Sequence, residues 1–169
     1  MTLKIIQFDG AFSRRLRIGV TDGFLFRCAS LVAHSGDSLL WMLGLAILYA
    51  SGNAYWQFRA LVMAAGLIIT AVAVQCLKYA VKRRRPEGSW GKIYRLSDPH
   101  SFPSGHAARG LVLAVIVIGL GPPWLGVLLL AWTPLVGIVR VMLGVHYLLD
   151  IFAGFTVGAL VGLIVLAVI

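Results

Sequence analysis

The amino-acid sequence is poor in acidic residues and in cysteine. It contains six aspartate and glutamate residues against 15 lysine and arginine residues, which gives a formal net charge of +9 at pH 7. Its two cysteines, Cys28 and Cys76, have no metal-ligand spacing, so we infer neither a disulfide nor a metal site. The N-terminal segment lacks an uninterrupted apolar run followed by a small-residue cleavage site, and we therefore expect no secretory signal peptide.

Hydrophobic residues are abundant: they make up 60% of the 169 residues, whereas soluble globular proteins contain about 45–50%. A helix needs about 20 mostly apolar residues to cross a bilayer, and shorter stretches cross by including flanking polar residues or in thinner lipid. We predict an all-α integral membrane helical bundle of about five transmembrane helices in residues 38–169, within a single domain 1–169. The five apolar stretches are Leu39–Ala50, Ala60–Leu77, Ala107–Leu120, Trp124–Val139 and Ile151–Ile169.

Residues 1–37 mix basic residues with aromatic and aliphatic ones. This composition is typical of an amphipathic helix that lies on anionic lipid headgroups. We therefore predict an amphipathic, interfacial N-terminal segment. The alternative is a solvated charged face that packs on the bundle.

The basic residues fall almost entirely on one predicted side of the membrane. With five spans, 14 of the 15 lie on the side of the N-terminus, and Arg59 alone lies opposite. The positive-inside rule places that charged side in the cytoplasm. No aromatic-basic nucleic-acid module is present, so we expect no nucleic-acid partner. The 14 residues are Lys4, Arg14, Arg15, Arg17, Arg27, Lys78, Lys82, Arg83, Arg84, Arg85, Lys92, Arg95, Arg109 and Arg140.

The first motif on this side is "KYAVKRRRP", at the end of the second span. Lys78 and Arg85 are seven residues apart, which is two helical turns, so both can project from one face. Pro86 disfavours helix at Arg85 and leaves its guanidinium free to turn toward a neighbour. The alternative is a basic cluster that only anchors the topology.

The second motif is "SFPSGHAARG", where the third span begins. Pro103, Ser104 and Gly105 precede a helix whose unpaired N–H groups and positive dipole end favour an anion. His106 lies in this field, and Arg109, one turn later, shares its face. The motif predicts an anion pocket; the alternative is an ordinary serine cap beside an interfacial histidine.

The third motif is "VRVMLGVHYLLD", between the last two spans. Gly144 permits a tight turn, and His146 and Asp150, four residues apart, share a helix face. An aspartate in this position accepts one ring N–H and leaves the other nitrogen free to attack. Arg140 and Asp150 lie near the membrane boundary, where ionisable residues are expensive and mostly functional. The alternative is a buried Arg140–Asp150 ion pair that joins two helices.

Together the three motifs contain the groups needed for phosphoryl transfer without a metal. Cations and N–H groups stabilise the phosphoryl oxygens, one histidine attacks phosphorus, and the other protonates the leaving oxygen. We expect no cofactor, because lysine and arginine supply the charge neutralisation that a metal would otherwise provide.

The same motifs resemble those of the type 2 phosphatidic acid phosphatase superfamily. Residues 78–86 fit K-x6-R-P, residues 103–106 fit P-S-G-H, and residues 140–150 fit R-x5-H-x3-D, in the family's order. The third motif of the family commonly begins Ser-Arg, whereas this chain has Val139 in place of the serine. One hydrogen bond to phosphate, worth about 1–3 kcal/mol, is therefore in question at this position.

The resemblance implies a role for each matching residue. His146 would be the nucleophile that forms a phosphohistidine, Asp150 its orienting partner, and His106 the general acid. The remaining matches would bind the substrate phosphate: Lys78, Arg85, Ser104, Gly105 and Arg140.

A narrower resemblance is to the polyisoprenoid (presqualene-type) diphosphate phosphatases. It rests on "KRRRP", "SFPSGHAARG" and "RVMLGVHYLLD", with an arginine, Arg109, after P-S-G-H, and on "FDGAFSRRL" and "SGDSLLWMLG" nearer the N-terminus. An extra cation suits a diphosphate. The implied substrate is an isoprenoid diphosphate in the membrane. Alternative substrates are phosphatidic acid, phosphatidylglycerophosphate, undecaprenyl diphosphate and lipid A, and the alternative of another class is a non-catalytic lipid-binding scaffold or transporter; no oligomeric state is predicted.

Two further sets of residues lie outside the motifs. Gly154, Gly158 and Gly162 recur every four residues on the last span and favour close helix approach, within the bundle or, alternatively, in a dimer. His34 and His100 do not fit the catalytic arrangement, and we expect both to be interfacial bystanders.

Overall fold

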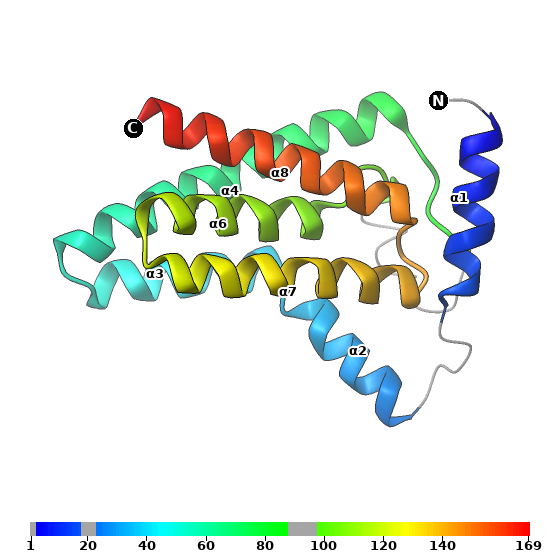
Figure 1. Cartoon of the computed structure of the whole chain (residues 1–169), viewed down its shortest axis with the longest axis horizontal. Coiled ribbons are helices and arrows are strands. Elements are labelled where there is room, and N and C mark those ends of the chain that lie inside the picture. The colour runs from blue at the N-terminus through cyan, green and yellow to red at the C-terminus, as the bar shows by residue number, and fades with distance from the viewer. Residues whose placement is uncertain (1–2, 18–22, 88–97) are drawn as a thin grey trace.

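The computed structural model describes residues 3–17, 23–87 and 98–169. Lys92 and Arg95, both counted on the charged side, lie outside these residues. The described chain forms a bundle of helices with one helix lying across its end (Figure 1). The helices are α1 (Leu3–Arg15), α2 (Phe24–His34), α3 (Ser38–Ser51), α4 (Ala54–Val81), α6 (Gly105–Leu120), α7 (Pro123–Met142) and α8 (Leu148–Val168).

Each predicted apolar stretch forms one helix of the bundle, so the prediction of an all-α integral membrane bundle is confirmed. α4, α7 and α8 are each long and apolar enough to cross a membrane. α2 and α3 would make a fourth span together, bent by 54° at the break between them. α6 is apolar but has only 16 residues. Among the described residues, three or four spans thus qualify by length and composition alone. α6 would cross as one of the short stretches, and the five-span topology stays a prediction.

Local sequence explains where several helices begin and end. Asn53 caps α4 by accepting a hydrogen bond from the Trp56 N–H at 3.3 Å, and Pro123 occupies the first turn of α7, where its missing N–H costs nothing. α4 ends where Lys82 adopts a left-handed conformation with φ of 51°. From there residues 83–85 run outside the helix, and the Arg83 carbonyl accepts the Ser101 N–H at 2.8 Å.

α6 is the central helix of the bundle and contacts α4, α7 and α8 (Figure 1). Its residues Ala107, Ala108, Val112 and Ala114 have no exposed surface. The outer helices instead expose large apolar side chains, which is the pattern expected of a surface that faces lipid. Examples on α4 and α8 are Leu61, Ile68, Val72, Leu160, Leu163 and Ile164.

α1 lies across the end of the bundle near the start of α8 (Figure 1). Its exposed face carries the apolar side chains of Ile5, Phe8 and Phe12, whereas Asp9 and Ser13 are buried. The helix is therefore amphipathic, as predicted. Asp9 and Ser13 face the protein, whereas Lys4, Gln7, Arg14 and Arg15 are exposed. That α1 lies at the membrane interface with its apolar side in lipid remains our proposal.

The glycines of α8 bring its backbone against α6. A Cβ added at Gly158 would lie 2.3 Å from the Ala108 carbonyl oxygen, and one added at Gly154 would lie 2.5 Å from the Ser104 carbonyl oxygen. Gly162 packs in the same way against Val115. The predicted role of the three glycines in packing this helix within the bundle is confirmed. The close approach also fixes the distance between the first turns of α6 and α8.

Replacing Gly158 by alanine should destabilise the bundle. The new methyl group meets backbone that has little room to move, and overpacking of this kind costs about 1–3 kcal/mol. We expect a lower midpoint of thermal unfolding for Gly158→Ala in detergent. Gly44→Ala is the matched control, because a Cβ there meets nothing within 4 Å. Equal midpoints for the two variants would contradict the packing argument.

Candidate active site

The helix ends that carry the three motifs meet at the end of the bundle crossed by α1 (Figure 1). Between them lies a cavity of about 450 Å³. Ser104 and Asp150 are buried next to this cavity but do not line it. The other predicted site residues line it: Lys78, Arg85, Gly105, His106, Arg109, Arg140 and His146.

One side of this cavity is apolar. Leu39 of α3 and Ala71 and Val74 of α4 line it, next to the cations at the helix ends. An amphiphilic phosphate needs an environment of this kind, because its headgroup requires positive charge and its tail requires apolar surface.

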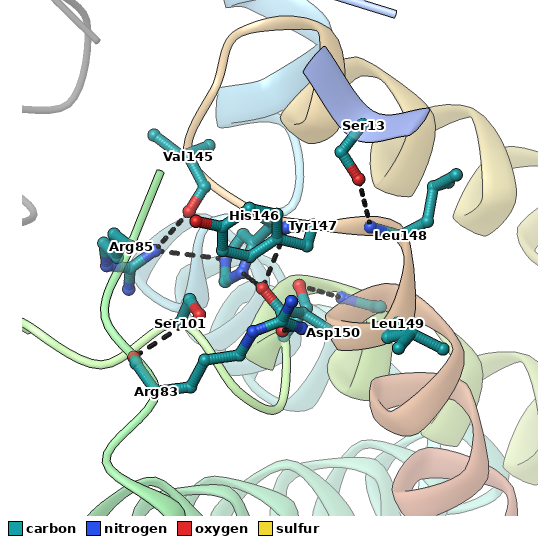
Figure 2. Close-up of polar contacts among 12 residues, drawn as sticks. Ser13, Arg83, Arg85, Ser101, Val145, His146, Tyr147, Leu148, Leu149 and Asp150 are labelled. Atoms are coloured by element: carbon teal, nitrogen blue, oxygen red, sulfur yellow. Dashed lines mark hydrogen bonds and ion pairs between the residues drawn. The ribbon is translucent and has the colours of Figure 1, made fainter. Parts of the chain in front are cut away.

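His146 and Asp150 form the predicted pair. His146 lies in the turn between α7 and α8, and its Nδ1 is 3.4 Å from Asp150 Oδ2 (Figure 2). The same carboxylate oxygen accepts the Tyr147 N–H at 2.9 Å. A proton on Nδ1 leaves the Nε2 lone pair of His146 available, and Nε2 lies 3.3 Å from the guanidinium of Arg85.

His146 is held neutral by its surroundings. Burial, opposed by the hydrogen bond to Asp150 and reinforced by the positive charge of Arg85, lowers the pKa of His146 to about 4. A nucleophilic imidazole must be unprotonated, so the neutral form of His146 is compatible with the predicted role of nucleophile.

Lys78 and Arg85 converge on Asp98, a residue that sequence analysis did not single out. Arg85 donates to Asp98 Oδ2 at 2.8 Å and to the Asp98 carbonyl at 2.7 Å, and the Lys78 ammonium also contacts Oδ2. Both cations are buried, so an anionic partner offsets their desolvation. The Asp98 carboxylate therefore occupies the two cations that a substrate phosphate would need.

His106 lies across the cavity on the first turn of α6. Its Nε2 is 2.7 Å from Asp37 Oδ1 and 3.1 Å from the Arg140 guanidinium, and its Nδ1 is 3.2 Å from Arg109. If Arg109 donates to Nδ1, the ring proton resides on Nε2 and faces Asp37. A ring in this form is neutral. The imidazolium that a general acid requires is favoured by the carboxylate of Asp37 and opposed by burial and by the positive charges of Arg109 and Arg140.

Asp37 also connects His34 to the site. His34 Nδ1 lies 2.9 Å from Asp37 Oδ2, so the carboxylate bridges two histidines. His34, which we expected to be a bystander, therefore contacts a residue that also contacts His106. This contact gives His34 no catalytic role. Neighbouring Gly36 packs against the His106 ring, where a Cβ would approach Cδ2 to 2.9 Å. No spacing rule predicts the contact between Asp37 and His106, because the two residues are 69 positions apart.

Ser104 acts as the helix cap that we considered as an alternative. Its hydroxyl accepts the Ala107 N–H at 3.5 Å, and its own N–H donates to the Asp150 carbonyl at 2.8 Å. Ser104 thereby ties the start of α6 to the start of α8. Its role, and that of Gly105, in binding phosphate remains a proposal.

Arg83 is the main contact of Asp150 that sequence analysis missed. We counted it as a topology charge, yet its guanidinium donates to Asp150 Oδ1 at 2.7 Å (Figure 2). Asp150 thus pairs with Arg83, in place of the Arg140–Asp150 pair that we considered. Residues 83–85 alternate in exposure: Arg84 is exposed, whereas Arg83 and Arg85 turn inward. An extended segment produces such alternation, whereas the end of a helix would not.

Val139, which stands where the family commonly has serine, is buried beside Ala29 and Ala33 of α2. It does not line the cavity. The position serves the contact between α7 and α2, and a valine fits that apolar surface.

The arrangement of these groups suits displacement at a phosphorus atom. A neutral histidine with its Nδ1 held by a carboxylate faces a ring of cations, and a second histidine stands across the same cavity. Residues 3–17, 23–87 and 98–169 contain no group of three or more His, Cys, Asp or Glu side chains placed to hold a metal ion.

Comparison with known proteins identifies the class. The model of the PAP2 superfamily matches residues 59–169, and the chain belongs to this family. The predicted resemblance is thereby confirmed. So is the prediction of a phosphoric ester hydrolase for lipid phosphates, at the level of the family.

Individual relatives refine this picture. The decaprenylphosphoryl-5-phosphoribose phosphatase of Mycobacterium tuberculosis is 32% identical over 139 residues, covering 79% of this chain and 75% of that protein. The undecaprenyl-diphosphatase of Sulfolobus acidocaldarius is 33% identical over 95 residues, which are 54% of this chain but only 46% of that protein. A PAP2-type phosphatidylglycerolphosphate phosphatase from Bacillus subtilis shares the fold, with a TM-score of 0.80 at 24% identity over 99% of this chain and 87% of that one.

Removing the Asp98 carboxylate should strengthen binding of inorganic phosphate. With Asp98→Asn, phosphate no longer competes with an internal anion for Lys78 and Arg85, and we expect its dissociation constant to fall about 3- to 10-fold. Isothermal titration calorimetry in detergent measures this. Glu87→Gln is the matched control, since it removes the same charge from the exposed Glu87 near Arg85. Weaker binding by Asp98→Asn would mean that Asp98 arranges the cations for phosphate and does not compete with it.

Acid should destabilise the protein partly through His146. Unfolded, its imidazole takes up a proton below about pH 6.5. In the folded protein, the imidazole stays unprotonated down to about pH 4. The free energy of unfolding therefore decreases as the pH is lowered from about 6.5 to about 4. At pH 5 the loss from this residue is about 2 kcal/mol. We expect the thermal midpoint of His146→Gln to fall less steeply from pH 7 to pH 5 than that of the unmodified protein; parallel curves would contradict this.

Proposed function

We propose that the chain is a metal-independent lipid phosphatase that hydrolyses the terminal phosphate of a polyisoprenoid diphosphate through a phosphohistidine on His146. The observation that carries this proposal is the placement of the His146–Asp150 pair and His106 around one cavity that is cationic at its end and apolar along one side. A scaffold that only binds lipid anions needs the cations but gains nothing from two oriented histidines.

In the first step, Nε2 of neutral His146 attacks the terminal phosphorus and the bond from phosphorus to the bridging oxygen breaks. His106, in its doubly protonated imidazolium form, donates one proton to that oxygen and becomes neutral, and the lipid monophosphate leaves. The Nδ1–H of His146 stays hydrogen-bonded to Asp150, which stabilises the positive charge on the substituted ring. Lys78, Arg85 and Arg140 bind the phosphoryl oxygens, and Arg109 supplies charge for the second phosphate.

In the second step, a water molecule attacks the phosphohistidine. His106, now unprotonated, takes one proton from the water as its oxygen bonds to phosphorus. The bond between phosphorus and Nε2 breaks, inorganic phosphate is released, and both histidines regain their starting forms. The contact of His106 with Asp37 favours the protonated ring in which this step ends.

The substrate class is supported by the names of two relatives. One is a decaprenylphosphoryl-5-phosphoribose phosphatase and the other an undecaprenyl-diphosphatase, so both act on polyisoprenoid phosphates by their names. The former provides a second candidate substrate, a sugar phosphate linked to a polyisoprenyl phosphate. The two candidates share an isoprenoid tail and a terminal phosphate and differ in what joins them. Phosphatidic acid, phosphatidylglycerophosphate and lipid A remain alternatives.

We further propose that the site opens on the cytoplasmic side. The support is the distribution of charge: 14 of 15 basic residues belong to the predicted cytoplasmic side, which is also the side of the three motifs. Arg59, the exception, contacts the Leu120 carbonyl at the opposite end of α6. This orientation favours a substrate of the inner leaflet over lipid A and undecaprenyl diphosphate, which usually require an outward-facing site.

Phosphate release by the purified protein in detergent tests the function. In excess chelator, we expect faster turnover of farnesyl diphosphate than of phosphatidic acid, with a farnesyl-phosphoryl-ribose 5-phosphate as the third substrate. His146→Ala should lose activity by about 10³-fold or more, and His100→Ala, outside the motifs, should retain it. An acid-labile, alkali-stable phosphoryl label on wild type, absent from His146→Ala, would identify the intermediate.

Each outcome of this assay has a separate meaning. Preference for the ribose phosphate would select the second candidate, and preference for phosphatidic acid would keep the mechanism but reject the isoprenoid substrate. Turnover that needs a divalent metal would contradict the metal-independent chemistry. Phosphate binding without turnover of any of the three substrates would favour the scaffold.

A further inference from the structure

We propose that Arg83 and Asp9, both outside the three motifs, are positioning residues that hold Asp150, and through it His146, in the orientation needed for attack. The inference rests on the proposed function, because it assigns these residues a role in phosphohistidine formation. It follows from a network of buried contacts that joins α1, the segment after α4, and the first turn of α8.

Arg83 lies between two carboxylates. One terminal nitrogen of its guanidinium donates to Asp150 Oδ1 at 2.7 Å and the other donates to Asp9 Oδ2 at 2.6 Å. The guanidinium also lies over the Tyr147 ring, 4.0 Å from its centroid. The Arg83 side chain is 12% exposed, and those of Asp9 and Asp150 are 4% and 0% exposed. Because water does not replace a lost partner at such buried ion pairs, each charged side chain is held in the position that keeps its partner.

The Arg83 contact determines how Asp150 presents itself to His146. Asp150 Oδ2 accepts from His146 Nδ1 and from the Tyr147 N–H, and Oδ1 accepts from Arg83 (Figure 2). Both oxygens of the carboxylate are therefore engaged and its plane is fixed. Without Arg83, Oδ1 would lose its partner in a fully buried site, and the carboxylate would rotate or take up a proton. Either change weakens the hold on the Nδ1–H of His146.

Asp9 anchors this arrangement from α1. Its Oδ1 accepts the Leu149 N–H at 3.2 Å and the Ser13 hydroxyl at 3.4 Å, while the Ser13 oxygen accepts the Leu148 N–H at 3.1 Å (Figure 2 shows the last contact). The first N–H groups of a helix have no partner within it. In α8 two of them are satisfied by side chains of α1, and the negative charge of Asp9 also favours this helix end.

Arg84 provides a matched comparison within the same segment. It is exposed, and its backbone pairs with His100, so Arg84→Gln removes the same charge without disturbing the chain path. Arg83 does not line the cavity that contains Lys78 and Arg85. A positioning role therefore predicts an effect on the rate of attack with little effect on the binding of phosphate.

The test compares Arg83→Gln, Arg83→Lys, Asp9→Asn and Arg84→Gln with the unmodified protein on its best substrate. We expect Arg83→Gln and Asp9→Asn to lower kcat about 10- to 100-fold, the usual cost of losing a residue that orients a functional group, with KM nearly unchanged. Arg83→Lys should recover part of kcat, because lysine keeps the positive charge. Recovery should be incomplete, because an ammonium group pairs well with only one of the two carboxylates. Arg84→Gln should retain kcat. In the double variant Arg83→Gln/Asp9→Asn, the fold-decrease in kcat should be smaller than the product of the two single fold-decreases, because both residues act through Asp150.

A second measurement does not need turnover. In protein with 15N-labelled histidine, the Nδ1 and Nε2 signals of His146 report its tautomer and its hydrogen bond to Asp150. We expect both signals to move in Arg83→Gln and Asp9→Asn and to stay in place in Arg84→Gln. Unchanged signals and unchanged kcat in the first two variants would overturn the inference, and so would a change confined to KM. If no substrate is turned over, the proposed function has failed, and the histidine signals alone decide on the positioning role.

Discussion

The site depends on neutralising a cluster of buried cations at one end of an apolar bundle. Lys78, Arg83 and Arg85 leave water together, and each does so against a carboxylate. Burying charge is unfavourable unless its partners are fixed in place, so these pairs impose positions on the segments that carry them. The need to surround phosphate with positive charge and the need to fold that charge into a membrane protein are met by the same few aspartates.

Close backbone packing turns these contacts into fixed geometry. Because α8 has glycine where it crosses α6, the two helices approach closely enough for the Ser104 N–H to donate to the Asp150 carbonyl. α6, which carries His106 in its first turn, and α8, whose Asp150 contacts His146, are therefore joined by a hydrogen bond where both helices begin. The proposed mechanism places a phosphorus atom between these two histidines. It needs such a constant separation, which flexible loops would not maintain.

Local patterns predicted the helices and most of the site, since each motif uses helical spacing or a helix end. Partners distant in sequence were missed: no periodicity relates Asp9 to Arg83, or Asp37 to His106. Choosing between Arg83 and Arg84 required knowing that α4 ends at Lys82. The scarcity of acidic residues could have indicated these partners, because few carboxylates are present to pair with so many buried cations. Of six in the chain, Asp37, Asp98 and Asp150 contact the predicted histidines or cations, and Asp9 holds Arg83.

The contact between α1 and α8 has a consequence for the order of assembly. Asp9 and Leu149 are separated by 140 residues, so α1 can make this contact only after α8 has been synthesised. Contacts of such long sequence separation form late, because the intervening chain must first be in place. During biosynthesis, therefore, a partly inserted chain can already contain Lys78 of α4 and His106 of α6 before His146, the proposed nucleophile, has its partner Asp150 on α8. The proposed activity would therefore require that α8 has joined the bundle.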